Sequence, residues 1–285
     1  MRILVRIGIA LMIALFGLVS YCSNTVTNPV TGEAQRVQLT AQQEVALGLQ
    51  ARQQMAAQYG GLYPDQGLQQ YIEQVGARVV QKSAAAKGPY PYQFSLLRDP
   101  KVINAFALPG GQVFITAALL QRLSSEAQLA GVLGHEVGHV VGRHGAEHLA
   151  KQQLGQSLVT AVGVAGSDGR DGGQSAAVLA QAVNQMVGLR YGREDELESD
   201  RLGLQFMAEA GYDPRGILEL IQILGASRGA GGQQPEFFSS HPNPDNRLQR
   251  LQESINKTYP NGVPATLQSG KEQFAQAVRS RLRGG

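Results

Sequence analysis

The chain has 285 residues, of which 43% are hydrophobic and 16% are charged. This composition is typical of a globular protein that buries a substantial core, and it excludes a mostly disordered or collagen-like chain. Basic residues outnumber acidic ones by 25 to 22, and by 23 to 22 without Arg2 and Arg6, so the charge gives no case for nucleic-acid binding. The single cysteine excludes an intramolecular disulfide and a cysteine-rich zinc finger.

The first 21 residues are typical of an export signal. Arg2 and Arg6 precede an apolar run from Ile7 to Val19, which is shorter than the 18 or more residues of a membrane-spanning helix. We therefore expect residues 1–21 to be a signal peptide, with an uncleaved membrane anchor as the alternative.

Cys22 lies where such a signal would be cut. The segment Val19-Ser20-Tyr21-Cys22 resembles a bacterial lipoprotein box, although Tyr21 replaces the small residue that usually precedes the cysteine. The resemblance predicts lipidation of Cys22, and Ser23 favours the outer membrane. The alternative is an ordinary cleaved signal with a free thiol. Either reading predicts an exported protein, and the first a periplasmic lipoprotein tethered to the outer membrane.

The remaining elements are predicted in chain order. Residues 22–39 are polar and rich in turn residues, which indicates an extended tether. One main folded domain over 40–258 and a tail over 259–285 with a short helix follow. Strands are expected at 92–97, 102–108 and 112–116, and the last two flank the turn Pro109-Gly110-Gly111. The chain is expected to be mostly helical from 124, with glycine-rich loops at 163–173 and 225–235. The expected helices span 40–59, 64–82, 174–190, 194–210, 214–226, 244–257 and 270–282. The pattern predicts an α+β, predominantly helical fold with a small sheet.

The segment His135-Glu136-Val137-Gly138-His139 carries an HExxH motif in an apolar helical context. Residues four apart in a helix lie about 40° apart, so both imidazoles can reach one metal ion. Zinc suits neutral imidazole and carboxylate ligands. Glu136 is placed to act on water rather than to ligate the metal. Gly134 and Gly138 weaken a helix, which suggests that another backbone approaches closely there.

A third ligand is expected from the acidic segment 191–203. Glu196 and Asp200 are four apart on one helical face; Glu196 could ligate zinc, and Asp200 could accept a hydrogen bond from a ligating histidine. The alternative is a solvated acidic face. His144 and His148 fall about 180° and 220° around a continuous helix from His135, so we expect them to face away from the metal as hydrogen-bonded or capping residues rather than as ligands.

These motifs resemble the HtpX/BepA/LoiP-like zinc metallopeptidases, the family that includes the CAAX prenyl protease. The resemblance rests on HExxH, on Arg193, Glu196 and Asp200, on the segment 104–111, and on the His-Pro segment 241–247. It implies a zincin-like (gluzincin) fold with a small sheet beside the HExxH helix. It also implies one zinc ion held by His135, His139 and Glu196. The segment 28–32 and Glu44 look like the secreted bacterial branch.

The resemblance implies a zinc endopeptidase of the cell envelope that acts on unfolded or misassembled proteins. Zinc would polarise the scissile carbonyl, and Glu136 would move the proton from water to the leaving amine. The strand Asn104-Ala105-Phe106-Ala107 could pair with an extended substrate, with an ordinary paired core strand as the alternative.

Two questions stay open from the sequence. His241 could donate to the developing oxyanion or occupy the open zinc position in a resting state, and its alternative is a turn that caps the next helix. The competing function is a latent metallopeptidase fold that acts as a chaperone or assembly factor mainly by binding.

Overall fold

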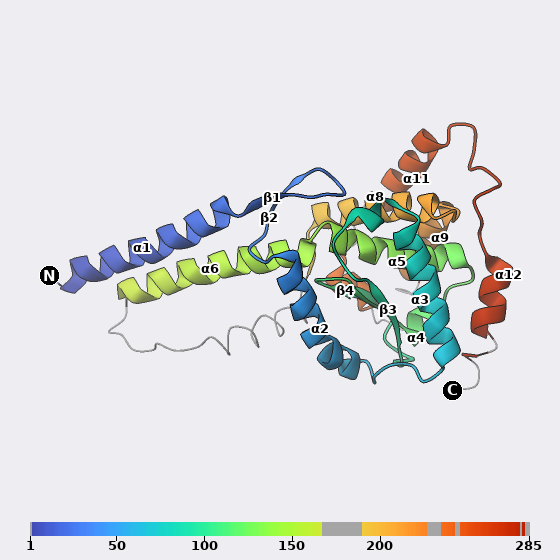
Figure 1. Ribbon diagram of the computed structural model, residues 1–285, viewed down its shortest axis with the longest axis horizontal. Helices are drawn as coiled ribbons and strands as arrows, with labels where there is room; N and C mark the ends of the chain where they lie inside the picture. Colours follow the sequence, from blue (N-terminus) through green and yellow to red (C-terminus); the bar gives the residue numbers. More distant parts are fainter. Residues whose placement is uncertain (1, 167–189, 227–234, 243–245, 280, 283–285) are drawn as a thin grey trace.

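The computed structural model describes residues 2–166, 190–226, 235–242, 246–279 and 281–282, and it is predominantly helical (Figure 1). Apart from Arg190, the expected helix at 174–190 lies outside these residues, as do most residues of both glycine-rich loops, although 163–166 are helical. The longer helices are α1 (Arg2–Ser23), α2 (Ala41–Gln58), α3 (Gln66–Gln81), α5 (Glu126–Val141), α6 (His144–Gly166), α8 (Arg193–Glu209), α9 (Arg215–Ala226) and α11 (Arg247–Thr258). Short helical turns are η1 (Ala84–Lys87), α4 (Ala117–Leu120), α10 (Phe237–Ser240), α12 (Lys271–Phe274) and the π-helical η2 (Ala275–Arg279).

A three-stranded sheet lies against the helices. Its strands β3 (Gln93–Leu97), β5 (Gln112–Thr116) and β4 (Ala105–Leu108) follow the order β3-β5-β4, with β5 parallel to β3 and antiparallel to β4. The turn between β4 and β5 uses Gly110 and Gly111 with φ of 82° and 97°, a region that glycine adopts readily. This confirms the predicted strand–turn–strand unit and makes β4 an edge strand of the described sheet.

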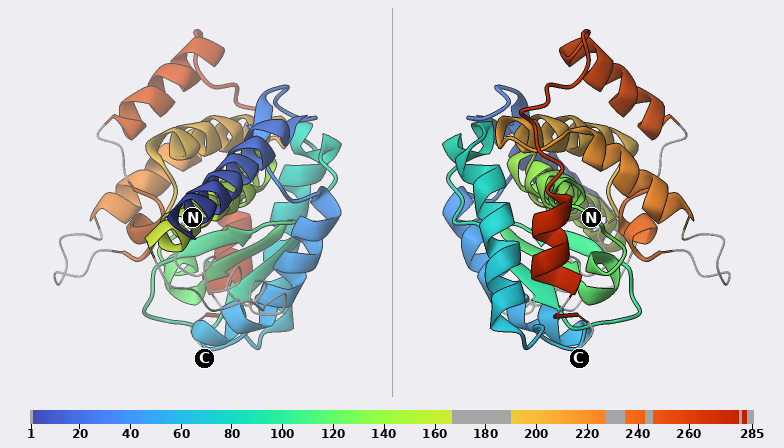
Figure 2. Two further views of the ribbon diagram at one scale, coloured as in Figure 1. Left: turned by 90° about the vertical axis from the view of Figure 1, so that its left-hand side faces the viewer. Right: turned by 90° about the vertical axis from the view of Figure 1, so that its right-hand side faces the viewer.

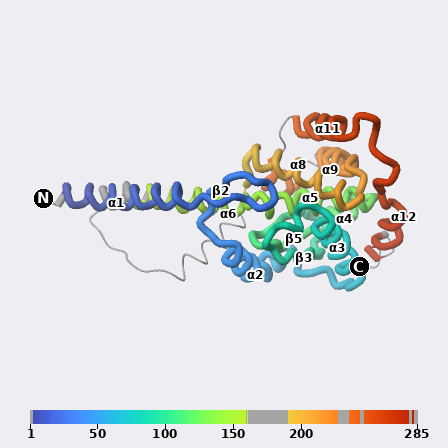
Figure 3. The backbone as a smooth tube through the Cα atoms, turned by 45° about the horizontal axis from the view of Figure 1, so that its top comes forward, coloured from blue at the N-terminus to red at the C-terminus, as the bar shows by residue number. Residues whose placement is uncertain are grey.

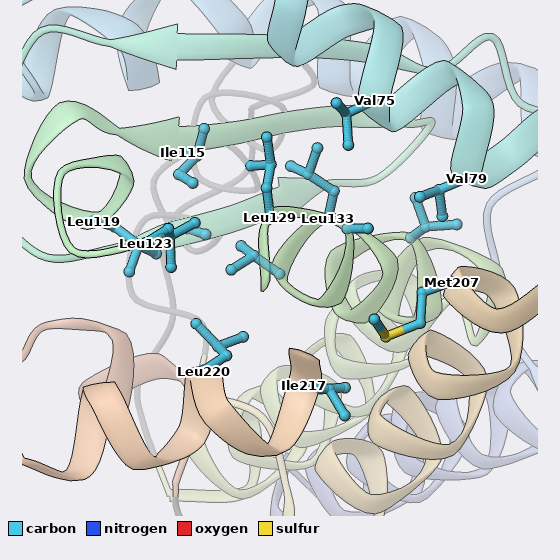
Figure 4. Close-up of a cluster of buried hydrophobic side chains, with 14 of the residues drawn as sticks. Val75, Val79, Ile115, Leu119, Leu123, Leu129, Leu133, Met207, Ile217 and Leu220 are labelled. Atoms are coloured by element: carbon cyan, nitrogen blue, oxygen red, sulfur yellow. The ribbon is translucent and has the colours of Figure 1, made fainter. Parts of the chain in front are cut away.

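Helix α5 is the centre of the core. Every residue from Ala127 to Val141 is buried, because the sheet and α3 cover one side of the helix and α8 and α9 cover the other (Figure 2). Figure 4 shows Leu129 and Leu133 of α5 between Ile115 of the sheet and Ile217 of α9. A helix that is apolar nearly all round is stable only when it is enclosed in this way.

The backbones of α5 and α8 meet at glycines. A Cβ on Gly203 would lie 2.8 Å from the backbone nitrogen of His135, and one on Gly138 would lie 2.9 Å from the Cα of Ser199. A Cβ on Gly134 would lie 3.0 Å from the carbonyl oxygen of Gly203. The expectation that a backbone approaches closely at Gly134 and Gly138 is therefore confirmed.

The segment 24–36, expected as part of an extended tether, folds as a hairpin. Its strands β1 (Thr25–Thr27) and β2 (Ala34–Arg36) pair antiparallel. The buried amide of Asn28 donates to the carbonyl oxygen of Val141 (2.6 Å), and that of Gln35 donates to the carbonyl oxygen of Gly142 (2.6 Å). The hairpin thus satisfies carbonyl groups that α5 leaves without partners at its C-terminus.

The chain turns sharply between α5 and α6 at Arg143, which has φ of 54°. The guanidinium of Arg143 pairs with the buried carboxylate of Glu44 and donates to the carbonyl oxygen of Leu39 (2.7 Å). Tyr90 donates to the other oxygen of Glu44 (2.8 Å). A non-glycine residue in the left-handed region is held there by its surroundings, and here an ion pair with α2 supplies that hold.

Helices α1 and α6 lie side by side and extend away from the core (Figures 1 and 3). Within the described chain, the segment Ile3–Ser23 of α1 is the single helix that is long and apolar enough to cross a membrane. Its apolar side chains are mostly exposed, as expected of a segment that a membrane or an export machinery recognises.

Replacing Gly203 by Ala is expected to destabilise the protein by about 1–3 kcal/mol, because the added methyl group would meet backbone atoms of α5 that have no room to move. Urea unfolding measures the change. Gly155→Ala is the matched control: nothing lies within 4 Å of its Cβ position, so the variant should gain up to about 1 kcal/mol from helix propensity. Equal effects of the two substitutions would contradict the close approach.

Candidate metal centre

All five histidines of the chain face carboxylates of one short stretch of α8. His148 Nε2 lies 2.8 Å from Asp195, and His144 Nε2 lies 3.2 Å from Glu198. The other three, His135, His139 and His241, lie within 3.5 Å of Glu196. The acidic segment is therefore not a solvated face: Glu194 is exposed, but Glu196 and Asp200 are buried against imidazoles.

Four ligand atoms converge at the centre of this group. One atom each from His135, His139, Glu196 and His241 lies within 4.8 Å of all the others. His135 Nε2 lies 3.1 Å from His139 Nε2 and 3.5 Å from His241 Nδ1, and Glu196 lies 3.4 Å from His139 Nε2. Zinc–ligand bonds of about 2.0–2.1 Å in a tetrahedron place the ligands about 3.3 Å apart. The donor set and its spacing therefore fit zinc.

The charge states of two of these groups, His139 and Glu196, also suit a cation. Burial lowers the pKa of His139 well below its ordinary value, which leaves the neutral imidazole that metals require. Burial by itself raises the pKa of Glu196, but the imidazoles of His241 and His139 outweigh it and hold this pKa well below the ordinary value. Glu196 is therefore an anion although it is buried.

Glu136 lies beside this group. Its Oε1 lies 3.7 Å from His241 Nε2, and neither carboxylate oxygen has a hydrogen-bond partner among the described residues. Burial raises the pKa of Glu136, a shift that the nearby His241 and His135 partly oppose. A buried carboxylate without a partner is costly, and nothing among the described residues compensates Glu136 by a hydrogen bond.

Asp200 holds His135 from behind. Its Oδ1 lies 3.0 Å from His135 Nδ1, and Arg247 of α11 donates to both of its oxygens (2.5 and 2.6 Å). Arg247 Nη1 also lies 3.3 Å from Glu196 Oε2. The bidentate pair keeps Asp200 in place, with Asp200 Oδ1 aimed at His135.

The segment from Pro235 to His241 runs over the centre. Phe237 stacks on His241 with ring centroids 4.4 Å apart, and its backbone N–H donates to the carbonyl oxygen of Ile103 (3.2 Å). Glu236 accepts from the Tyr59 hydroxyl (2.5 Å) and from the amide of Asn104 (3.2 Å). His241 is fully buried as a result.

The other predicted residues lie as follows. Asn104, Ala105, Phe106 and Ala107 are buried at the start of the edge strand β4, which packs against α5. Cys22 is exposed near the end of α1, away from the metal group on a different element. The structure therefore brings the catalytic and metal candidates together and leaves Cys22 apart from them.

The expectation that His144 faces away from the centre is wrong. It assumed a continuous helix, whereas α5 ends at Val141 and the turn at Arg143 brings His144 Nδ1 to 2.9 Å from His139 Nδ1. His148, one turn further, is at the rim with Asp195.

Sequence reasoning assigned no role to three residues that shape the centre. Arg247 belongs to the quoted His-Pro segment, but only the fold shows it paired with Asp200. Tyr191 stacks on His139 at a centroid distance of 3.9 Å, and Phe237 on His241. The sequence offers two signals for these residues: Tyr191 stands just before the acidic helix, and Arg247 ends the His-Pro segment.

A family model described as peptidase family M48 matches residues 66–255. The chain belongs to this family. It is 33% identical over 237 residues to the beta-barrel assembly-enhancing protease of Yersinia pestis, covering 81% of this chain and 48% of that protein. The corresponding protease of Escherichia coli K12 is 30% identical over 266 residues, covering 92% and 53%. The mitochondrial metalloendopeptidase OMA1 of Schizosaccharomyces pombe is 32% identical over 183 residues, covering 64% and 52%.

Membership of peptidase family M48 confirms the predicted resemblance and the predicted α+β, mostly helical fold. The family and the buried His-His-Glu-His group together support zinc as the cofactor. The chain spans about half the length of the curated relatives that it matches.

Arg247→Met is expected to destabilise this M48 domain by about 3–5 kcal/mol, because it leaves the buried Asp200 carboxylate without its cation. Urea unfolding of the metal-free protein measures the loss. Arg250→Met, on the exposed side of the same helix, should change stability by less than about 0.5 kcal/mol. An Arg247 variant as stable as the Arg250 variant would contradict the assigned pairing.

Proposed function

We propose that the chain is a zinc-dependent endopeptidase of the bacterial cell envelope that hydrolyses peptide bonds in unfolded or misassembled envelope proteins. The observation that carries this proposal is the buried His135, His139 and Glu196 group with the unpartnered carboxylate of Glu136 beside it. The names of the relatives, which include a metalloendopeptidase and a protease that enhances beta-barrel assembly, support the reaction and the class of substrate.

His135, His139 and Glu196 are the proposed ligands of one zinc ion, and Asp200 is proposed to orient His135. When bound, zinc polarises the scissile carbonyl and makes water a better nucleophile near neutral pH. Glu136 removes the proton from the attacking water and passes it to the leaving amine. The raised pKa of Glu136 suits both halves of that transfer, since it makes the carboxylate a stronger base and the carboxylic acid able to protonate the amine.

His241 has two candidate roles, and its position supports the resting one. Its Nδ1 lies 2.8 Å from Glu196 and 3.5 Å from His135 Nε2, within the group that fits a tetrahedron. There it would be a fourth ligand of a bound zinc ion and would exclude substrate and water from that position, and Phe237 packs over it. The other role, donation to the developing oxyanion, requires the segment 235–241 to move so that Nε2 faces substrate.

The strand from Asn104 to Ala107 is the proposed substrate-binding edge. Among the described strands, β4 is paired on one side only, by β5. The backbone N–H of Phe237 already donates to Ile103 at the start of this edge, which is the type of main-chain bond that an extended substrate would make. Main-chain recognition is tolerant of sequence and therefore suits unfolded proteins.

Glu136→Gln is expected to lower the rate of casein cleavage by about 10²–10⁴-fold while zinc content stays the same, because the amide cannot accept a proton. Cleavage and metal content are measured side by side in the full chain purified in detergent. If Glu136→Gln cleaves casein as fast as the wild type does, the assignment of Glu136 as the base is contradicted.

The same cleavage assay, extended to His241→Ala, tests the second candidate function, a latent fold that acts mainly by binding as a chaperone or assembly factor. The complete burial of His241 in the metal group favours latency. If wild-type protein with bound zinc cleaves nothing, and His241→Ala also cleaves nothing, the binding function replaces the endopeptidase. Cleavage that increases in His241→Ala supports a shut endopeptidase, whereas cleavage that decreases supports the oxyanion role.

We further propose that the protein is exported to the periplasm and tethered to the outer membrane through a lipidated Cys22. The apolar helix α1 and the exposed Cys22 at its end support this location. Cys22→Ser should abolish incorporation of labelled palmitate. The variant should no longer fractionate with the outer membrane: it should be soluble if the signal is still cleaved, and it should stay in the inner membrane if the signal is not cleaved. Wild-type protein without label would contradict lipidation.

A further inference from the structure

His144 is held against the back of His139 by the break in the helix. Its Nδ1 lies 2.9 Å from His139 Nδ1, and its ring is 2% exposed. The space for this ring exists because residue 142 is glycine: a Cβ there would lie 2.4 Å from His144 Nε2. The turn at Arg143 and the missing side chain at Gly142 thus both serve one contact.

The proton positions along this contact follow from the metal site. His139 directs Nε2 toward the ligand group, so a neutral His139 that ligates through Nε2 carries its proton on Nδ1. His144 Nδ1 faces that proton and can accept it only when it is itself unprotonated, and the hydroxyl of Ser199, 3.3 Å from the same nitrogen, can then donate to it as well. The proton of a neutral His144 then lies on Nε2, and Nε2 faces Glu198 Oε2 at 3.2 Å.

We propose that His144 is a positioning residue for the metal centre: it accepts a hydrogen bond from His139 and, with Glu198, sets the tautomer and orientation of that imidazole. This inference rests on the proposed role of His139 as a zinc ligand. The two histidines of the HExxH motif then have different hydrogen-bond partners. His135 is held by the carboxylate of Asp200, whereas His139 is held by the imidazole of His144, which is held in turn by the carboxylate of Glu198.

A neutral acceptor has a physical reason at this position. Among the described residues, the buried centre already contains three carboxylates, those of Glu196, Glu136 and Asp200, beside a single arginine, Arg247. An additional carboxylate directly against His139 would add negative charge that the interior must solvate. The imidazole of His144 provides the acceptor and keeps the charge at Glu198, whose side chain is 23% exposed.

The test compares zinc affinity across variants of the full chain in detergent, by competition with a chromogenic chelator, with urea unfolding of each metal-free protein alongside. His144→Leu removes the acceptor and is expected to weaken zinc binding by about 10–100-fold. His144→Asn places an oxygen at the same number of bonds from Cβ as Nδ1, so it should restore most of the lost affinity. His148→Leu, one turn away on the same helix, should bind zinc as the wild type does.

Glu198→Leu gives a second route if His144→Leu folds poorly. It removes the group that fixes the His144 tautomer, so it should weaken zinc binding less than His144→Leu but measurably. Glu194→Leu, an exposed position on the same helix, is its control and should have no effect. Wild-type affinity in Glu198→Leu, or an equal loss in His144→Leu and His144→Asn, would overturn the proposal.

His139→Ala separates this proposal from the one on which it rests. If His139→Ala binds zinc as tightly as the wild type, His139 is not a ligand and the metal site itself is misassigned. If His139→Ala loses zinc but folded His144→Leu does not, the metal site stands and only the role of His144 fails.

Discussion

The centre of this protein depends on the contact between the backbones of α5 and α8. Both helices have glycine where they meet, at Gly134 and Gly138 on one side and Gly203 on the other. The close approach lets short side chains reach across: Asp200 extends from α8 to His135, and Glu196 touches both histidines of the motif. With larger residues at the crossing, the helices would separate and these carboxylates would no longer reach the imidazoles.

A second constraint acts at the end of α5. Two segments near the N-terminus bind the last turn of α5 and the residues after it. They are the hairpin, through Asn28 and Gln35, and the start of α2, through Glu44. A buried helix end needs partners for its free carbonyl groups, and these side chains supply them. The same contacts force the turn that separates α5 from α6, so one local arrangement both ends the helix and places His144.

Much of the centre follows from local spacing in the sequence. The four-residue spacing of His135 and His139, and that of Glu196 and Asp200, correctly placed each pair on one helical face, and two helix-weakening glycines in an apolar helix correctly indicated a close backbone. The Pro109-Gly110-Gly111 turn was predictable because its backbone needs glycine. These features depend on helical geometry and turn chemistry, which act over a few residues.

The features that the sequence did not reveal depend on long-range contacts. His144 was misplaced because a helix period was continued through Arg143, whose left-handed backbone is held by Glu44, 99 residues earlier in the chain. Arg247 looked like part of a turn motif, and only its position on a packed helix shows that it neutralises Asp200. The hairpin looked like a tether because its strands are short and polar, and its two capping amides act on carbonyls more than 100 residues away.

The hairpin and its neighbours also decide what the smallest folding unit is. The range that the family model matches, 66–255, contains all four residues of the candidate metal group. It omits Asn28, Gln35 and Glu44, and it omits Phe274, which is buried in the core and packs against Tyr71. A fragment cut to the shared range would leave the end of α5 uncapped, Arg143 without its anion and a hole beside α3. The range that the family model matches is therefore smaller than the set of residues that pack together, and fragments for expression, labelling or crystallisation should be bounded by buried contacts rather than by the ends of that match.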